Sequence, residues 1–214
     1  MSRHLPNLLT AGRFFLAIGF FIILGLYSGR AETSWPVLDV AFAIFLVAAL
    51  TDVVDGYLAR RLGRITAFGR IADPFVDKII VCGALACFLS DQFLRLQPDG
   101  TLENLTGWSS WMVVLILARE LLVTGMRSFS ESHHIPFFAT ASGKLKMFIQ
   151  CVAVCWTLFY VAHWTEGPEW TRLVLKILIW TTTLYTGLSG LIYIKRAYHL
   201  LRVPPNEPPS PLQA

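Results

Sequence analysis

The sequence has little charge. Only 15% of its 214 residues are charged and 55% are apolar, whereas a soluble domain carries about 25% charged and roughly 45–50% apolar residues. Four cysteines are too few to hold a chain of this length as a disulfide scaffold. The net charge of +4 comes from basic residues scattered between apolar blocks, which argues against nucleic-acid binding. The composition excludes a disordered chain and indicates an integral membrane protein built of helices.

Six apolar stretches are each long enough to cross a bilayer, for which a helix needs about 20 residues. They run over residues 8–27, 37–59, 71–94, 108–129, 143–163 and 170–193. We therefore predict an all-α, polytopic protein with six transmembrane helices in one domain, residues 1–202. Residues 203–214 contain five prolines, which cannot propagate a helix, and are expected to form a disordered tail.

Lysine and arginine are unevenly divided between the two ends of these stretches. One end has only Arg30, Arg95, Arg172 and Lys176, and the remaining fourteen basic residues fall at the other end, together with both termini. Cytoplasmic loops of membrane proteins carry the excess of positive charge. We expect a multi-pass protein of the inner (plasma) membrane with both termini in the cytoplasm.

The segment between residues 51 and 78 combines carboxylates with small residues at helical spacing. Its members are Asp52, Asp55, Gly56 and Ala59, followed by Gly69, Asp73 and Asp77. At 100° per residue, each group lies on one face of its helix. Because a short connection makes the two helices neighbours, the two acidic faces are expected to meet at the cytoplasmic end.

Four carboxylates in one site repel one another and would take up protons unless cations neutralise them. Oxygen-only ligands suit Mg²⁺ or Mn²⁺, and two such ions together would serve a phosphate-bearing substrate. The alternative is that these are ordinary surface charges at helix ends. Surface charges alone do not explain why four carboxylates and three small residues recur in register on adjacent helices, so we favour the metal site.

The motif Asp52-x-x-Asp55-Gly56-x-x-Ala59-Arg60, followed after eight residues by Gly69-x-x-x-Asp73-x-x-x-Asp77, resembles the signature of the CDP-alcohol phosphotransferase family. The resemblance implies six membrane helices, a homodimer, and transfer of the phosphatidyl group of CDP-diacylglycerol to an alcohol with release of CMP. It implies metal ligation by Asp52, Asp55 and Asp73, with Asp77 as a further ligand or as the general base.

The same resemblance assigns residues to the nucleotide. By position, Gly56, Ala59 and Gly69 would line the cytidine pocket, with Arg60 close to it. The opening segment of the chain is also similar to that of the family, so that Asn7, Thr10 and Arg13 are candidates to contact the nucleotide or its phosphates. The alternative is that Asn7 caps the first helix and that Arg13 extends to the interface.

The acceptor is indicated by a second group of charges. Arg119, Glu120 and Arg127 lie in the fourth stretch and Lys144 and Lys146 begin the fifth. They resemble the phosphatidylglycerophosphate synthase branch of the family, whose acceptor is glycerol 3-phosphate. The four cations would bind its phosphate, and Glu120 would orient an arginine or lysine. Alternatively, they face anionic lipid headgroups.

Three alternatives to this function are open to a sequence of this kind. Within the family, inositol phosphate, serine or phosphatidylglycerol are rival acceptors. Outside it, acidic pairs in spans also mark cation transporters, but these often carry matching internal repeats, and here the acidic motif occurs once. A membrane prenyltransferase would show a second acidic motif.

Overall fold

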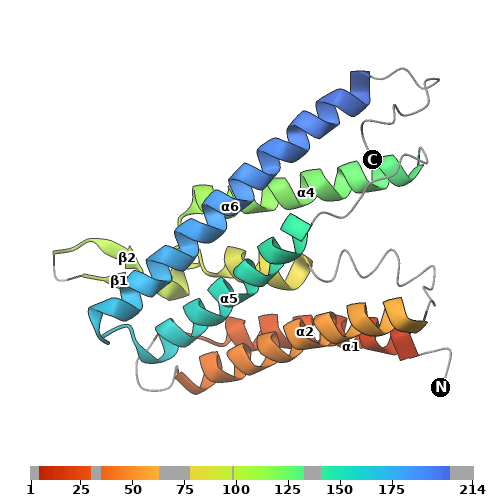
Figure 1. The fold of residues 1–214 in the computed structure, drawn as a ribbon. Coiled ribbons are helices and arrows are strands. Elements are labelled where there is room, and N and C mark those ends of the chain that lie inside the picture. The colour runs from red at the N-terminus through yellow and green to blue at the C-terminus, as the bar shows by residue number, and fades with distance from the viewer. Residues whose placement is uncertain (1–4, 30–34, 63–77, 98, 133–140, 203–214) are drawn as a thin grey trace.

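The computed structural model describes residues 5–29, 35–62, 78–97, 99–132 and 141–202. They form a helical bundle with a short β-hairpin at one end (Figure 1). The helices are α1 (Leu5–Gly25), α2 (Trp35–Leu62), the segment Lys78–Cys87, α4 (Ser110–Ser132), α5 (Ala141–His163) and α6 (Glu169–Arg202). Proline stands in the first turn of α1 and of α2, at Pro6 and Pro36, where a missing N–H leaves no helical bond unmade.

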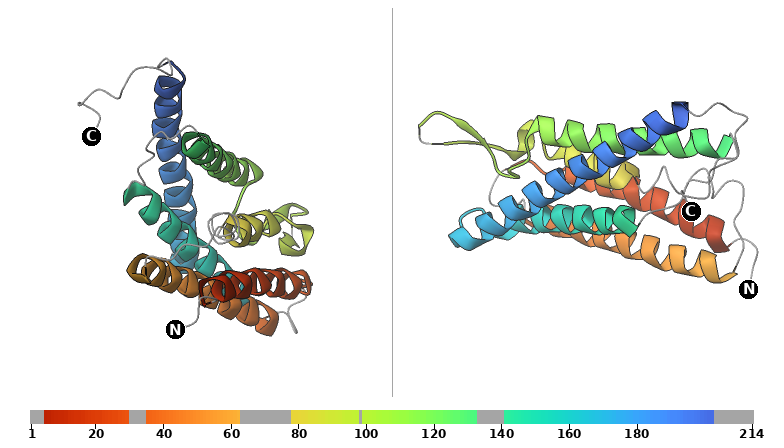
Figure 2. Two further views of the ribbon diagram at one scale, coloured as in Figure 1. Left: turned by 90° about the vertical axis from the view of Figure 1, so that its right-hand side faces the viewer. Right: turned by 45° about the horizontal axis from the view of Figure 1, so that its top comes forward.

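Helix α5 lies between two pairs of helices. It packs against α2 on one side and against α6 on the other, while α1 packs on α2 and α4 packs on α6. Both views of Figure 2 show this arrangement. The C-terminal ends of α2, α4 and α6 lie at the end of the bundle opposite the hairpin (Figure 1).

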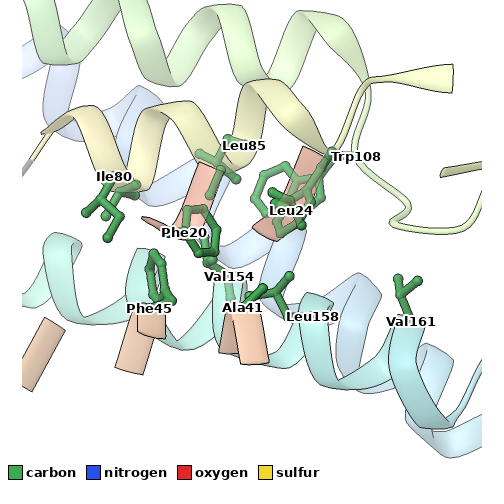
Figure 3. Close-up of a cluster of buried hydrophobic side chains, with 14 of the residues drawn as sticks. Phe20, Leu24, Ala41, Phe45, Ile80, Leu85, Trp108, Val154, Leu158 and Val161 are labelled. Carbon is green, nitrogen blue, oxygen red and sulfur yellow. The ribbon is translucent and has the colours of Figure 1, made fainter. Parts of the chain in front are cut away.

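The core joins α1, α2, α5 and the segment Lys78–Cys87. Phe20 and Phe45 are buried with their ring centroids 5.6 Å apart. Ile80 and Val154 are part of the same buried cluster (Figure 3). This packing holds the helix that follows Asp77 against the helix that carries Asp52.

The helical class is confirmed, but the third predicted span is wrong at its C-terminal end. The helix stops at Cys87, whose carbonyl accepts a hydrogen bond from Ser90 Oγ at 2.6 Å. A 3₁₀ turn (Asp91–Phe93) and strand β1 (Leu94–Leu96) follow. Phe93 is fully buried and stacks on Tyr27 at 4.9 Å. Phe93 is apolar because it packs in the core beside the hairpin. A hydropathy average over the sequence cannot distinguish such a buried residue from one in a membrane span.

Two of the helices in the described part of the chain are long and apolar enough to cross a membrane, Leu145–His163 and Glu169–Lys195. Three others are apolar but shorter there, namely Ala11–Gly25, Pro36–Thr51 and Lys78–Cys87. The predicted number of six spans is therefore not confirmed. The predicted tail, residues 203–214, lies outside the described residues.

Helix α6 has the polarity of a helix that faces lipid. Its exposed side is a stripe of large apolar residues at spacings of three and four: Trp170, Leu173, Ile177, Trp180, Leu184, Leu188 and Leu191. Its buried side carries hydroxyl groups, those of Thr182, Thr183, Thr186 and Ser189 among them. Apolar surface of this extent is stable only against another apolar phase, so the distribution supports a membrane protein.

The hairpin pairs β1 with β2 (Leu102–Asn104) in antiparallel register. Hydrogen bonds of the Asn104 side chain link the hairpin to the bundle. Its Nδ2 donates to the Phe88 carbonyl at 3.0 Å, and its Oδ1 accepts from the Thr106 N–H at 2.9 Å. Arg95 and Glu166 form an exposed salt bridge across to the start of α6, at 2.8 Å.

Asn104→Ala is expected to destabilise this end of the bundle. It leaves the Thr106 N–H without its acceptor, and an unsatisfied group costs about 1–3 kcal/mol. The Phe88 carbonyl keeps its hydrogen bond from Thr106 Oγ1 at 3.1 Å. We expect the thermal unfolding midpoint of the purified protein to fall by about 5 °C. Asp99→Ala is the control, because it removes a hydrogen bond to Thr101 at the exposed tip of the hairpin. Equal midpoints for the two variants would contradict this role of Asn104.

Candidate active site

The predicted acidic residues of the second stretch lie in the last turns of α2. The helix continues through Asp52, Asp55, Gly56, Ala59 and Arg60 to Leu62, so the spacing on which the predicted shared face depends is helical. Gly69, Asp73 and Asp77 lie outside the described residues. Within the part of the chain that is described, no three His, Cys, Asp or Glu side chains gather as a metal site. The two-metal site therefore stays a prediction.

The predicted nucleotide contacts of the opening segment lie at the start of α1. Asn7 and Thr10 are in its first two turns, and Arg13, one turn further on, is buried with 5% of its surface exposed. Because α1 packs against α2, this segment lies beside the helix that carries Asp52. Their contact with a nucleotide remains a prediction.

A buried charge cluster joins α4 to α5. Arg119, Glu120 and Lys146 have 7%, 8% and 4% of their surface exposed. Glu120 Oε1 accepts a hydrogen bond from Arg119 Nη1 at 3.2 Å and also pairs with Lys146 Nζ. The sequence predicts that Glu120 orients an arginine or a lysine, and its carboxylate contacts one of each. The group carries a net charge of +1 in an interior where unpaired charge is costly.

Helix α6 completes the cluster. Arg119 Nε donates to Ser189 Oγ at 3.1 Å, and the Arg119 guanidinium carbon lies 5.0 Å from the centre of the Tyr193 ring. Neither Ser189 nor Tyr193 is among the residues predicted from the sequence. The available signal was the polar face of α6, in which residues 182, 186, 189 and 193 recur at spacings of three and four.

Two buried donors of this region have no hydrogen-bond partner among the described residues. They are Arg119 Nη2 and Gln150 Nε2. Gln150, also missed at the sequence level, lies one turn after Lys146 on the buried face of α5 and is 4% exposed. Buried donors are nearly always paired in native proteins. An acceptor oxygen of a ligand would satisfy Arg119 Nη2.

The cluster lies close to the helix that follows Asp77. The Lys146 ammonium is within electrostatic range of Lys78 and Cys82, at the start of the segment Lys78–Cys87. Arg127 is exposed two turns beyond Arg119, and Lys144 is in the first turn of α5. Of the four predicted acceptor cations, the structure brings together Arg119 and Lys146.

The fold and this site define a helical membrane protein with a cationic cluster buried among its helices. A family model described as CDP-alcohol phosphatidyltransferase matches residues 3–187. The chain belongs to the CDP-alcohol phosphatidyltransferase family.

Three relatives match this chain over most of its length. A CDP-diacylglycerol–glycerol-3-phosphate 3-phosphatidyltransferase of Bacillus subtilis (strain 168) is 34% identical over 206 residues, which cover 93% of this chain and 97% of the relative. A protein of the same name from Rickettsia prowazekii (strain Madrid E) is 28% identical, over 91% of this chain and 96% of its own length. A probable phosphatidylglycerophosphate synthase of Mycobacterium tuberculosis (strain ATCC 25618 / H37Rv) is 36% identical, over 91% and 81% respectively.

Proposed function

We propose that this protein transfers the phosphatidyl group of CDP-diacylglycerol to a hydroxyl of glycerol 3-phosphate, giving phosphatidylglycerophosphate and CMP. The observation that carries the proposal is the buried group of Arg119, Glu120 and Lys146, with its net positive charge and its unpaired donors. Relatives over nearly the whole chain bear the name of this activity. A cationic cluster suits an acceptor that carries a phosphate, and it does not suit serine.

The proposal of a metal site rests on the chemical type of the ligands, which are all carboxylate oxygens. Asp52 and Asp55 stand three residues apart on a continuous helix, and with Asp73 and Asp77 they would supply only carboxylate oxygens, the ligands that Mg²⁺ and Mn²⁺ prefer. Two such ions, when bound, would neutralise negative charge on the pyrophosphate. Gly56, Ala59 and Gly69 would leave room for the cytidine, and Arg60, Asn7 and Thr10 would contact CDP.

The chain's own residues then bring the acceptor to the lipid. Arg119 and Lys146 hold its phosphate, with Arg127 and Lys144 nearer the entrance, and Glu120 keeps the two buried cations in place. The acceptor hydroxyl attacks the phosphorus of the phosphatidyl group, its proton passes to Asp77 as general base, and the bond from phosphorus to the CMP oxygen breaks.

We further propose the topology that this reaction requires. Six helices cross the inner membrane, and the aspartates and both termini face the cytoplasm. The lipid substrate enters sideways from the leaflet and the water-soluble acceptor enters from the cytosol. The fourteen basic residues at the cytoplasmic ends of the predicted spans support this orientation. A homodimer is the assembly that the family resemblance implies.

An acceptor panel tests the proposal. Purified protein with Mg²⁺ and CDP-diacylglycerol is expected to release CMP when glycerol 3-phosphate is added, and to release little with serine, inositol phosphate or phosphatidylglycerol. CMP is quantified by chromatography. Equal CMP release with serine or inositol phosphate would overturn the assignment of the acceptor.

A further inference from the structure

The Arg119 guanidinium is held from α6 on two of its sides. Ser189 Oγ accepts a hydrogen bond from Nε at 3.1 Å, and the guanidinium carbon lies over the Tyr193 ring, 5.0 Å from its centre. The Ser189 hydroxyl itself donates to the Thr186 carbonyl at 2.9 Å. Because its hydrogen is used there, a lone pair of the oxygen is available to Arg119, and the direction of the bond is defined.

Gly190 allows α6 to approach the arginine closely. A Cβ at this position would lie 3.2 Å from Arg119 Cγ and 3.8 Å from Arg119 Cβ, and the first of these distances is tighter than ordinary packing. The stem of the arginine therefore runs directly over the backbone of α6. Ser189, Gly190 and Tyr193, which we call the α6 clamp, all lie beyond the matched residues 3–187.

The clamp and Glu120 account for two of the three nitrogens of the guanidinium. Nε is bound to Ser189 and Nη1 to Glu120, while Nη2 is buried without a partner among the described residues. An arginine fixed in plane and orientation loses little further freedom when it binds an oxyanion.

From these contacts we propose that Ser189, Gly190 and Tyr193 are positioning residues that aim Arg119 Nη2 at the phosphate of the acceptor. This inference rests on the proposed function and adds the residues that determine acceptor affinity. Ser189 and Tyr193 act through Arg119 and do not touch the substrate. Their loss should therefore change the KM for the acceptor and leave the KM for CDP-diacylglycerol and the turnover number nearly unchanged.

Four variants of the full-length protein in detergent or in vesicles test the clamp. Ser189→Ala and Tyr193→Leu are each expected to raise the KM for glycerol 3-phosphate by about 5- to 30-fold, the range for losing a hydrogen bond to a charged group or a desolvated ring contact. Ser189→Thr keeps the hydroxyl and should recover most of the affinity. Thr183→Val is the matched control, because Thr183 is a buried α6 hydroxyl that donates to the Ile179 carbonyl.

The outcomes separate this inference from the proposed function. If the wild-type protein releases no CMP with glycerol 3-phosphate, the proposed function is wrong, and so is the proposed role of the clamp. If the wild type is active, an unchanged acceptor KM in Ser189→Ala and Tyr193→Leu overturns the clamp alone. Equal losses for both substrates, or the same loss in Thr183→Val, would show general damage to α6 and would also overturn it.

Discussion

Asp77→Asn is expected to lower turnover by about 10²- to 10⁴-fold, the usual contribution of a general base, with the KM for CDP-diacylglycerol largely intact. The amide has nearly the shape of the carboxylate but cannot accept the proton of the attacking hydroxyl. Turnover is measured as CMP release at saturating concentrations of both substrates. Wild-type turnover in this variant would remove Asp77 from the mechanism.

The metal dependence of the variants distinguishes a base from a ligand. Asp52→Asn and Asp55→Asn are expected to raise the Mg²⁺ concentration needed for half-maximal activity, because each removes a charged ligand oxygen. If Asp77 is the base, additional Mg²⁺ does not restore Asp77→Asn, and recovery with Mg²⁺ would assign Asp77 as a ligand instead. Asp39→Asn is the matched control, since Asp39 lies near the other end of α2 and pairs with His163 at 2.8 Å.

Glu120→Ala is expected to destabilise the protein strongly. Its carboxylate stands between Arg119 and Lys146, and removing one partner of a buried ion pair costs about 3–5 kcal/mol because uncompensated charge remains. For a chain of this size, the unfolding midpoint should fall by about 10 °C. The double variant Glu120→Ala/Lys146→Met should recover part of the loss, because one of the two unpaired cations is gone.

An exposed pair provides the control for Glu120. Glu166→Ala breaks the Arg95–Glu166 bridge, whose side chains are 51% and 76% exposed, and such pairs contribute about 0–1 kcal/mol. The midpoint should therefore change by no more than a few degrees. If Glu120→Ala and Glu166→Ala lowered the midpoint equally, the account of Glu120 as the central charge of the cluster would be wrong.

Most of the helices were predictable because a helix in lipid needs a long apolar segment, and such segments are visible as runs of apolar residues along the sequence. The third stretch shows the limit of that reasoning. Phe93 and Leu94 extend the apolar run, yet Phe93 packs under the hairpin and Leu94 begins a strand. The hairpin itself depends on long-range bonds of Asn104, to Phe88 for example, which no local pattern encodes.

The candidate site was predictable where charge interrupts apolar sequence. Arg119 and Glu120 stand out because an adjacent charge pair in an apolar helix needs partners. Ser189 does not stand out, since hydroxyls in membrane helices often bond their own backbone, as Thr182 and Thr183 do in α6. Only the packing of α6 on α4 distinguishes Ser189 from these neighbours.

The central claim is tested most directly by following label from glycerol 3-phosphate into lipid. Purified protein is incubated with Mg²⁺, CDP-diacylglycerol and labelled glycerol 3-phosphate, and lipid and nucleotide products are measured together. The account predicts labelled phosphatidylglycerophosphate and CMP in equal amounts. Consumption of CDP-diacylglycerol with no label entering lipid would contradict it.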